Sequence, residues 1–193
     1  AEIERCVRHP VELSIAGRTD AGVHGWGQVI SFDVDTDLVA SGKGSPARLA
    51  RSINRQCVPG IVVRDAQLAA ADFDARFSAL WRSYRYTIVN RPIPDPFLAA
   101  TSWWVPQDLD IHALRLSCDA LYGLHNFSSF CRRPKPNPVT GFEPSLMRRV
   151  HDASWHELGD GVLRFDIRAS SYCHQMVRSI VGTMVEMGRG FRR

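Results

Sequence analysis

Lysine is almost absent from this 193-residue chain: 22 of its 24 basic residues are arginine, and only Lys43 and Lys135 are lysine. The formal net charge of +4 and the pI of about 9.0 favour an anionic partner. Arginine makes planar, bidentate contacts to phosphate and stacks on bases. A GC-rich genome, whose codons favour arginine everywhere, produces the same bias, so composition alone leaves both explanations open.

Long apolar runs are also absent. No run approaches the roughly 20 residues needed to span a bilayer, and no basic and apolar leader of the secretory type is present. Apolar residues nevertheless make up 45% of the chain, which is enough for a packed core. The sequence therefore predicts a soluble protein, without membrane association, of one large or two small domains.

Cysteine and histidine lack the spacings of a metal site. The five cysteines are odd in number, widely scattered and form no CxxC pair, and the seven histidines show no zinc spacing. We therefore expect a reduced, cytoplasmic compartment and no structural metal.

Alternation of apolar and polar residues indicates an α+β fold. We expect strands at residues 11–15, 29–34, 60–65, 83–90, 150–157 and 162–169. Helices are expected at 46–56, 110–122 (closed by Gly123) and 174–187, and the proline-rich stretch 132–144 is expected to be an extended loop. Alternating strands of this kind usually carry helices on one face and leave the other face open to a ligand.

The ends of the chain and its proline content bear on its organisation. The chain lacks an initiating methionine, residues 1–8 resemble the end of a helix, and residues 188–193 form a basic tail, so we expect a fragment. A domain boundary is favoured near the proline-rich stretch 91–97.

The densest polar cluster is residues 16–24 (AGRTDAGVH), between the first two expected strands. Its glycines allow a tight bend and close backbone approach. Asp20 would project from the tip with Arg18 beside it. On spacing alone, a hairpin whose Asp binds its own backbone is the better explanation, so the spacing does not establish a catalytic role.

The last expected helix has one continuous apolar arc, formed by Met176, Val177, Ile180, Val181, Met184 and Val185. His174 and Arg178 lie at one edge of that arc. An arginine there either extends to water or meets a carboxylate. On the strand at 83–90, Tyr84 and Tyr86 share one face and could serve as core aromatics or as a platform for base stacking.

Four blocks, in this order, resemble the TruA-type tRNA pseudouridine synthases. Residues 17–24 (GRTDAGVH), followed by 27–29 (GQV), resemble the active-site signature of that family. Residues 73–79 (FDARFSA) with 84–86 (YRY) resemble the family's second motif, and residues 121–130 (LYGLHNFSSF) resemble its third. Residues 174–182 (HQMVRSIVG) resemble the helix near its C-terminal end. The four matches together cover essentially the whole chain.

The resemblance implies a fold of two pseudo-symmetric α/β halves. Their mostly antiparallel sheets would join into one mixed sheet, with helices on one face and the active-site cleft between the halves. The halves would be residues 1–80, without the family's first strand, and 81–193, without the C-terminal end. Residue 25 and the loop 132–144 follow no strong family pattern.

The resemblance also implies a reaction and its residues. The family isomerises uridine to pseudouridine in the anticodon arm of tRNA without metal, cofactor or ATP, and it forms homodimers; DNA and membranes are not partners. Asp20 would be the catalytic carboxylate, attacking a carbon or removing a sugar proton. Tyr84 would stack on the flipped uracil, Arg178 would pair with Asp20, and Arg18 would lie near the RNA backbone.

Two other functions fit the sequence less well than the synthase. An RNA-binding module with an open sheet is disfavoured because the RNP1 pattern is absent. A carboxylate-dependent hydrolase would need a second, acidic residue as proton donor, whereas the surroundings of Asp20 in the sequence are rich in arginine.

Overall fold

A computed structural model describes residues 2–42, 44–133, 136, 139–141 and 143–191 of the chain. The chain divides into two compact units. Unit 1 comprises Ala1–Arg18 and Gly25–Ala79, and unit 2 comprises Thr19–His24 and Leu80–Arg193. Parts of the predicted loop at 132–144 lie outside the described residues. The division into halves at residues 80 and 81, as independently folded domains, stays a prediction.

Unit 1 contains two packed helices and a short hairpin. Its elements are α1 (Glu2–Val7), β1 (Ser14–Ile15), β2 (Ile30–Ser31), α2 (Thr36–Ala40) and α3 (Pro46–Cys57). β1 pairs with β2 in antiparallel fashion. The helices α1 and α3 pack together, and Val7, Leu49 and Ile53 are buried there. The predicted helix at 46–56 is confirmed, with Ser45 as its N-cap residue and Pro46 in its first turn.

Three strand predictions in unit 1 are corrected. The segments 11–15 and 29–34 pair over only two residues each, as β1 and β2. Residues 60–65 form no strand. The side chain of Asn54 accepts a hydrogen bond from the Val63 N–H at 2.6 Å and donates one to the Val63 carbonyl at 2.9 Å. An amide side chain therefore satisfies the backbone groups that a neighbouring strand would have paired.

Unit 2 is built on a mixed five-stranded sheet. Its strands are β3 (Arg82–Val89), β4 (Ser102–Trp104), β5 (Gly123–Asn126), β6 (Met147–Glu157) and β7 (Val162–Ala169), in the order β4-β3-β7-β6-β5. β3 and β4 are parallel, and the other pairs are antiparallel. The predicted α+β class is confirmed. Strands in the described residues form two separate sheets, so their joining into one sheet across a cleft stays a prediction.

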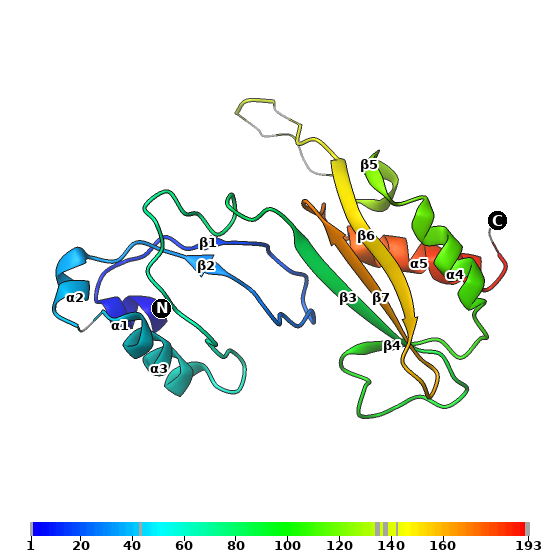
Figure 1. Cartoon of the computed structure of the whole chain (residues 1–193), viewed down its shortest axis with the longest axis horizontal. Helices are drawn as coiled ribbons and strands as arrows, with labels where there is room; N and C mark the ends of the chain where they lie inside the picture. Colours follow the sequence, from blue (N-terminus) through cyan, green and yellow to red (C-terminus); the bar gives the residue numbers. More distant parts are fainter. Residues whose placement is uncertain (1, 43, 134–135, 137–138, 142, 192–193) are drawn as a thin grey trace. The chain divides into compact units, whose positions relative to one another are not determined.

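Helices α4 (Ile111–Asp119) and α5 (Met176–Gly188) lie on one face of this sheet (Figure 1). α4 begins at Asp110, whose carboxylate accepts the N–H groups of His112 and Ala113 at 2.9 and 3.1 Å. Its predicted end was wrong: α4 ends at Asp119. Gly123 does not close the helix but starts β5 with a φ of +99°, a conformation that favours glycine.

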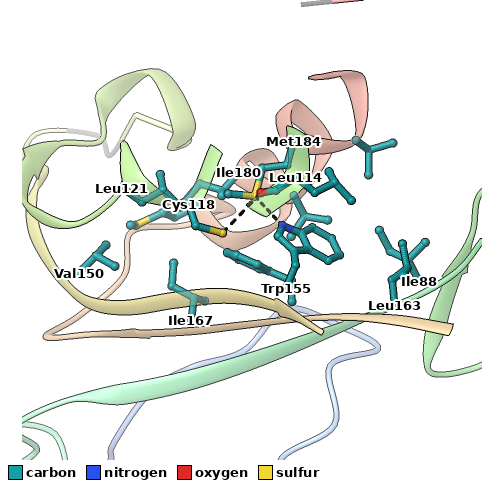
Figure 2. Close-up of a cluster of buried hydrophobic side chains, with 14 of the residues drawn as sticks. Ile88, Leu114, Cys118, Leu121, Val150, Trp155, Leu163, Ile167, Ile180 and Met184 are labelled. Carbon is teal, nitrogen blue, oxygen red and sulfur yellow. Dashed lines mark hydrogen bonds between the residues drawn. The ribbon is translucent and has the colours of Figure 1, made fainter. Parts of the chain in front are cut away.

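The core of unit 2 lies between the sheet and these two helices (Figure 2). Trp155 of β6 and Phe165 of β7 are 3% and 0% exposed and pack with ring centroids 5.1 Å apart. The Trp155 indole donates to the sulfur of Met184 on α5 at 3.4 Å. Burial of a side chain of this size contributes about 1.5–3 kcal/mol, so the core fixes α5 against the sheet.

The apolar arc predicted for the last helix is confirmed. Of its six residues, five are buried and Val177 is partly buried against the core. Tyr84 and Tyr86 of β3 also pack against this core, beside buried Ile88, as expected for residues on one strand face. No helix in the described part of the chain has the length and apolar content to cross a bilayer.

Candidate active site

The first motif of unit 2 is a tight turn that carries Asp20. The Val23 N–H donates to the Asp20 carbonyl at 3.2 Å, which closes a four-residue turn over 20–23. Gly22, its third residue, has a φ of +85°. A positive φ at this position is the requirement of a type II turn, and glycine meets it without steric cost. The glycine is needed for its backbone conformation and not for space, because nothing lies within 4 Å of an added Cβ.

Two side chains at the N-terminal end of α5 meet the Asp20 carboxylate: Arg178 within the helix and His174 just before it. His174 Nε2 lies 3.1 Å from Oδ1 of Asp20, and Arg178 Nη1 lies 3.8 Å from Oδ2. The expectation that Asp20 and Arg178 meet within about 4 Å is confirmed. Asp20 is the most enclosed of the three, with 28% of its side chain exposed, against 49% for His174 and 62% for Arg178. The carboxylate is therefore partly enclosed, with a guanidinium on one oxygen and an imidazole on the other.

Tyr84 lies within electrostatic range of this carboxylate. Burial raises the pKa of the Tyr84 phenol, the negative charge of Asp20 raises it further, and Arg82 acts in the opposite direction. The Tyr84 ring is partly buried and meets the ring of Tyr172 edge-on, with centroids 4.8 Å apart. Tyr84 thus forms an aromatic surface next to Asp20, and it is not sealed in the core.

Of the remaining polar groups, Arg18 belongs to the other unit and Cys118 is unsuited to the chemistry. Arg18 is exposed and belongs to unit 1, so its role at an RNA backbone stays a prediction. Burial raises the pKa of the Cys118 thiol to about 11, which leaves it protonated and unreactive at neutral pH. In the described residues, no group of three or more His, Cys, Asp or Glu side chains could hold a metal ion.

The second and third motifs have visible structural roles. Asp74 of the second motif accepts the N–H groups of Arg76 and Phe77, both at 2.8 Å, and so shapes a turn in unit 1. In the third motif, Asn126 of β5 accepts the Ser128 N–H at 3.0 Å and starts the single turn η1 (Ser128–Phe130).

Sequence reasoning missed two features of this site. His174 was placed only at the edge of the apolar arc, yet it approaches Asp20 more closely than Arg178 does. The predicted helix at 174–187 starts too early: α5 begins at Met176 and Gln175 has a left-handed backbone, so helical spacing does not explain how His174 reaches Asp20. The structure also joins Cys131 to Cys173, a pairing that neither the number nor the spacing of the cysteines indicated.

Comparison with known proteins identifies the family. Residues 118–193 match the sequence profile described as tRNA pseudouridine synthase. The tRNA pseudouridine synthase A of Leifsonia xyli subsp. xyli is 38% identical over 202 residues, which cover 98% of this chain and 68% of that protein. This chain belongs to the tRNA pseudouridine synthase family. The family's enzymes are isomerases that modify tRNA.

Other pseudouridine synthases show the same relation. The enzyme named tRNA pseudouridine synthase A of Moorella thermoacetica is 38% identical over 98% of this chain and 72% of its own length. The protein of that name from Gloeobacter violaceus is 36% identical over 97% of this chain but only 58% of its own length. The chain therefore spans between 58% and 72% of the length of these pseudouridine synthases.

The site also separates the synthase from the alternatives. In the described residues, the ion-pair partners of Asp20 are an arginine and a histidine. A carboxylate-dependent hydrolase instead needs a second carboxyl group near the first as proton donor. A plain RNA-binding module gives no reason for one carboxylate to be held between an arginine and a histidine.

Proposed function

We propose that this chain isomerises uridine to pseudouridine in tRNA, with Asp20 as the catalytic carboxylate. The observation that carries the proposal is the Asp20 carboxylate between His174 and Arg178, on a turn of the synthase signature. A carboxylate held at a fixed position in this way is suited to attack a carbon or to remove a proton.

The reaction moves one bond of the nucleoside. The bond between ribose C1′ and uracil N1 breaks, and a bond between C1′ and C5 forms. The hydrogen on C5 is lost as a proton, and N1 gains a proton, so the product is an isomer of the substrate. The carboxylate acts either as a nucleophile on the nucleoside or as the base that removes a sugar proton, and it is regenerated at the end.

The target uridine has to leave the base stack to reach a carboxylate held in this way. Tyr84 is suited to receive the flipped uracil, because its ring is partly exposed and lies near Asp20. Aromatic rings stack on bases with about 1–3 kcal/mol per base. The phenol stays neutral at physiological pH, because its pKa is raised, so it does not repel the anionic substrate.

Three further features of the proposal rest on the family resemblance. The uridines are expected in the anticodon arm of tRNA. Arg18 is expected near the RNA backbone, where an exposed guanidinium would pair with phosphate. The working enzyme is expected to be a homodimer in the cytoplasm, and light scattering coupled to size-exclusion chromatography tests the oligomeric state.

Tritium release from tRNA labelled at uridine C5 tests the reaction. The proposed enzyme releases tritium into water as C5 loses its hydrogen. Asp20→Ala and Asp20→Asn should abolish the release while tRNA affinity changes little, because affinity comes from many phosphate contacts and not from one carboxylate. A tRNA whose only labelled uridines lie outside the anticodon arm is the matched substrate control. Release by either Asp20 variant would contradict the catalytic assignment.

A further inference from the structure

The segment that precedes α5 is anchored to the sheet through Tyr172. Its hydroxyl lies 3.0 Å from the carbonyl oxygen of Ile167 on β7 and 3.2 Å from that of Arg82 on β3. Burial raises the pKa of this phenol, so it keeps the hydrogen it donates. The backbone two residues before His174 is thus tied to two strands of the core.

The same segment is also held from its other side. Cys173 lies beside Cys131, with Cα atoms 5.7 Å apart, and the His174 carbonyl accepts the Arg132 N–H at 3.0 Å. Gln175 follows with a φ of +67°, which residues other than glycine rarely adopt. Such a conformation persists where the surrounding structure enforces it, and it is concentrated at functional sites. The backbone of His174 is therefore held in place by contacts other than the one between its side chain and Asp20.

We propose that His174 is a positioning residue for Asp20, a role that rests on the proposed function. Nε2 of the imidazole lies 3.1 Å from Oδ1 of the carboxylate, within the distance of an ion pair or a hydrogen bond. Arg178, at 3.8 Å from Oδ2, is beyond the range of a direct hydrogen bond and acts through its charge. Arg178 alone would leave the carboxylate free to turn about its Cβ–Cγ bond, whereas a donor on the other oxygen fixes its plane.

Orientation is the function that fits the exposure of these groups. The side chains of His174 and Arg178 are 49% and 62% exposed, and ion pairs with such exposure contribute little to stability. A reacting carboxylate, in contrast, depends strongly on its position, because a displacement of about 1 Å costs about 100-fold in rate. The anchored segment at 172–174 gives His174 the rigidity that positioning requires.

Single-turnover kinetics test the role. His174→Ala should slow pseudouridine formation by about 10- to 100-fold, with the Kd for tRNA changed by less than about threefold. His174→Gln should recover most of the rate, because its side-chain amide can reach the position of Nε2 and donate a hydrogen. His112→Ala, at an exposed histidine on α4, is the control and should behave as the unmodified protein. An unchanged rate for His174→Ala, or equal rates for the alanine and glutamine variants, would overturn the proposal.

A second measurement does not depend on the reaction. The imidazole ¹³Cε1 resonance of His174, assigned by its loss in His174→Gln, should shift in Asp20→Asn, while that of His112 should not. If the unmodified protein forms no pseudouridine, the proposed function fails, and this shift still decides whether His174 holds Asp20. A His174 resonance that is unaffected by Asp20→Asn refutes the contact and with it the positioning role.

Discussion

At the scale of single residues, the pairing of Arg178 with Asp20 should matter more for turnover than for stability. An exposed pair of this kind stabilises the fold by about 0–1 kcal/mol, so Arg178→Ala should unfold at nearly the same temperature as the unmodified protein. We expect the variant to lose about 100-fold in turnover, the cost of a carboxylate displaced by about 1 Å. Arg178→Lys should recover only part of the rate, because ammonium lacks the planar fork of guanidinium. Single-turnover rates and Kd values separate these effects, and equal losses in rate and affinity would argue against a role at the carboxylate.

Tyr84 offers a second residue-level prediction. Tyr84→Phe keeps the ring and its edge-on contact with Tyr172, so kcat/KM for pseudouridine formation should be nearly unchanged. Tyr84→Ala removes the stacking surface and should cost about 1–3 kcal/mol in binding of the transition state, measured as kcat/KM. Tyr86→Phe is the matched control on the same strand face. If Tyr84→Phe is as impaired as Tyr84→Ala, the hydroxyl matters and stacking does not explain the residue.

At the scale of elements, the turn at 20–23 makes a prediction about backbone strain. Gly22→Ala places a side chain at a φ of +85°, which costs about 1–2 kcal/mol even though the added Cβ meets no atom. Relief of that strain moves the turn, so turnover should fall together with stability. Gly42 has a similar φ of +72° and equally open surroundings, but it lies in unit 1 between α2 and α3.

The comparison of the two glycines isolates the functional part. Gly42→Ala should lower the melting temperature by a similar amount and leave the single-turnover rate unchanged. Gly27→Ala, with open space and no positive φ, should alter neither quantity. Equal losses of rate in Gly22→Ala and Gly42→Ala would show that the rate follows overall stability and not the position of Asp20.

Elements with a strong period could be predicted from the sequence, and those set by single tertiary contacts could not. The strands β6 and β7 and the apolar arc of α5 follow from alternation and helical periodicity, because each buries one continuous face. The expected strand at 60–65 has the composition of a strand, but the side chain of Asn54 forms the hydrogen bonds to the Val63 N–H and carbonyl that a neighbouring strand would have formed.

The candidate site shows the same limit. The meeting of Asp20 and Arg178 could be predicted because the resemblance supplied both residues and the helix pattern supplied a reason for their pairing. The contact of His174 with Asp20 depends on the anchoring of residues 172–174, which comes from side chains on β3 and β7 and from Cys131. Such contacts join segments far apart in the chain and leave no local periodicity to detect.

At the scale of the whole molecule, buried apolar side chains are unevenly divided between the two units. In the described residues of unit 1, the buried hydrophobic residues are Val7, Leu49, Ile53 and Ala75, whereas unit 2 contains an extended core around Phe165. Local stability follows the density of buried contacts and the length of hydrogen-bonded ladders. β1 and β2 pair over two residues, while β7 is paired on both sides over most of its length.

Amide hydrogen exchange should therefore distinguish the two units. Amides of β7, and those of β6 that pair with it, should be the slowest in the chain, because they open only with the core of unit 2. Amides of β1 and β2 should exchange faster by several orders of magnitude, since about 1.4 kcal/mol of local stability corresponds to tenfold in protection. Leu114→Ala leaves a cavity in the core of unit 2 and should lower its stability by about 2–5 kcal/mol. Exchange in β6 and β7 should therefore become faster, while exchange in α3 should not change. Uniform protection across both units, or faster exchange of α3 in Leu114→Ala, would contradict this expectation. Either result would mean that the chain unfolds as one cooperative body and that the small core of unit 1 is stabilised as strongly as the large core of unit 2.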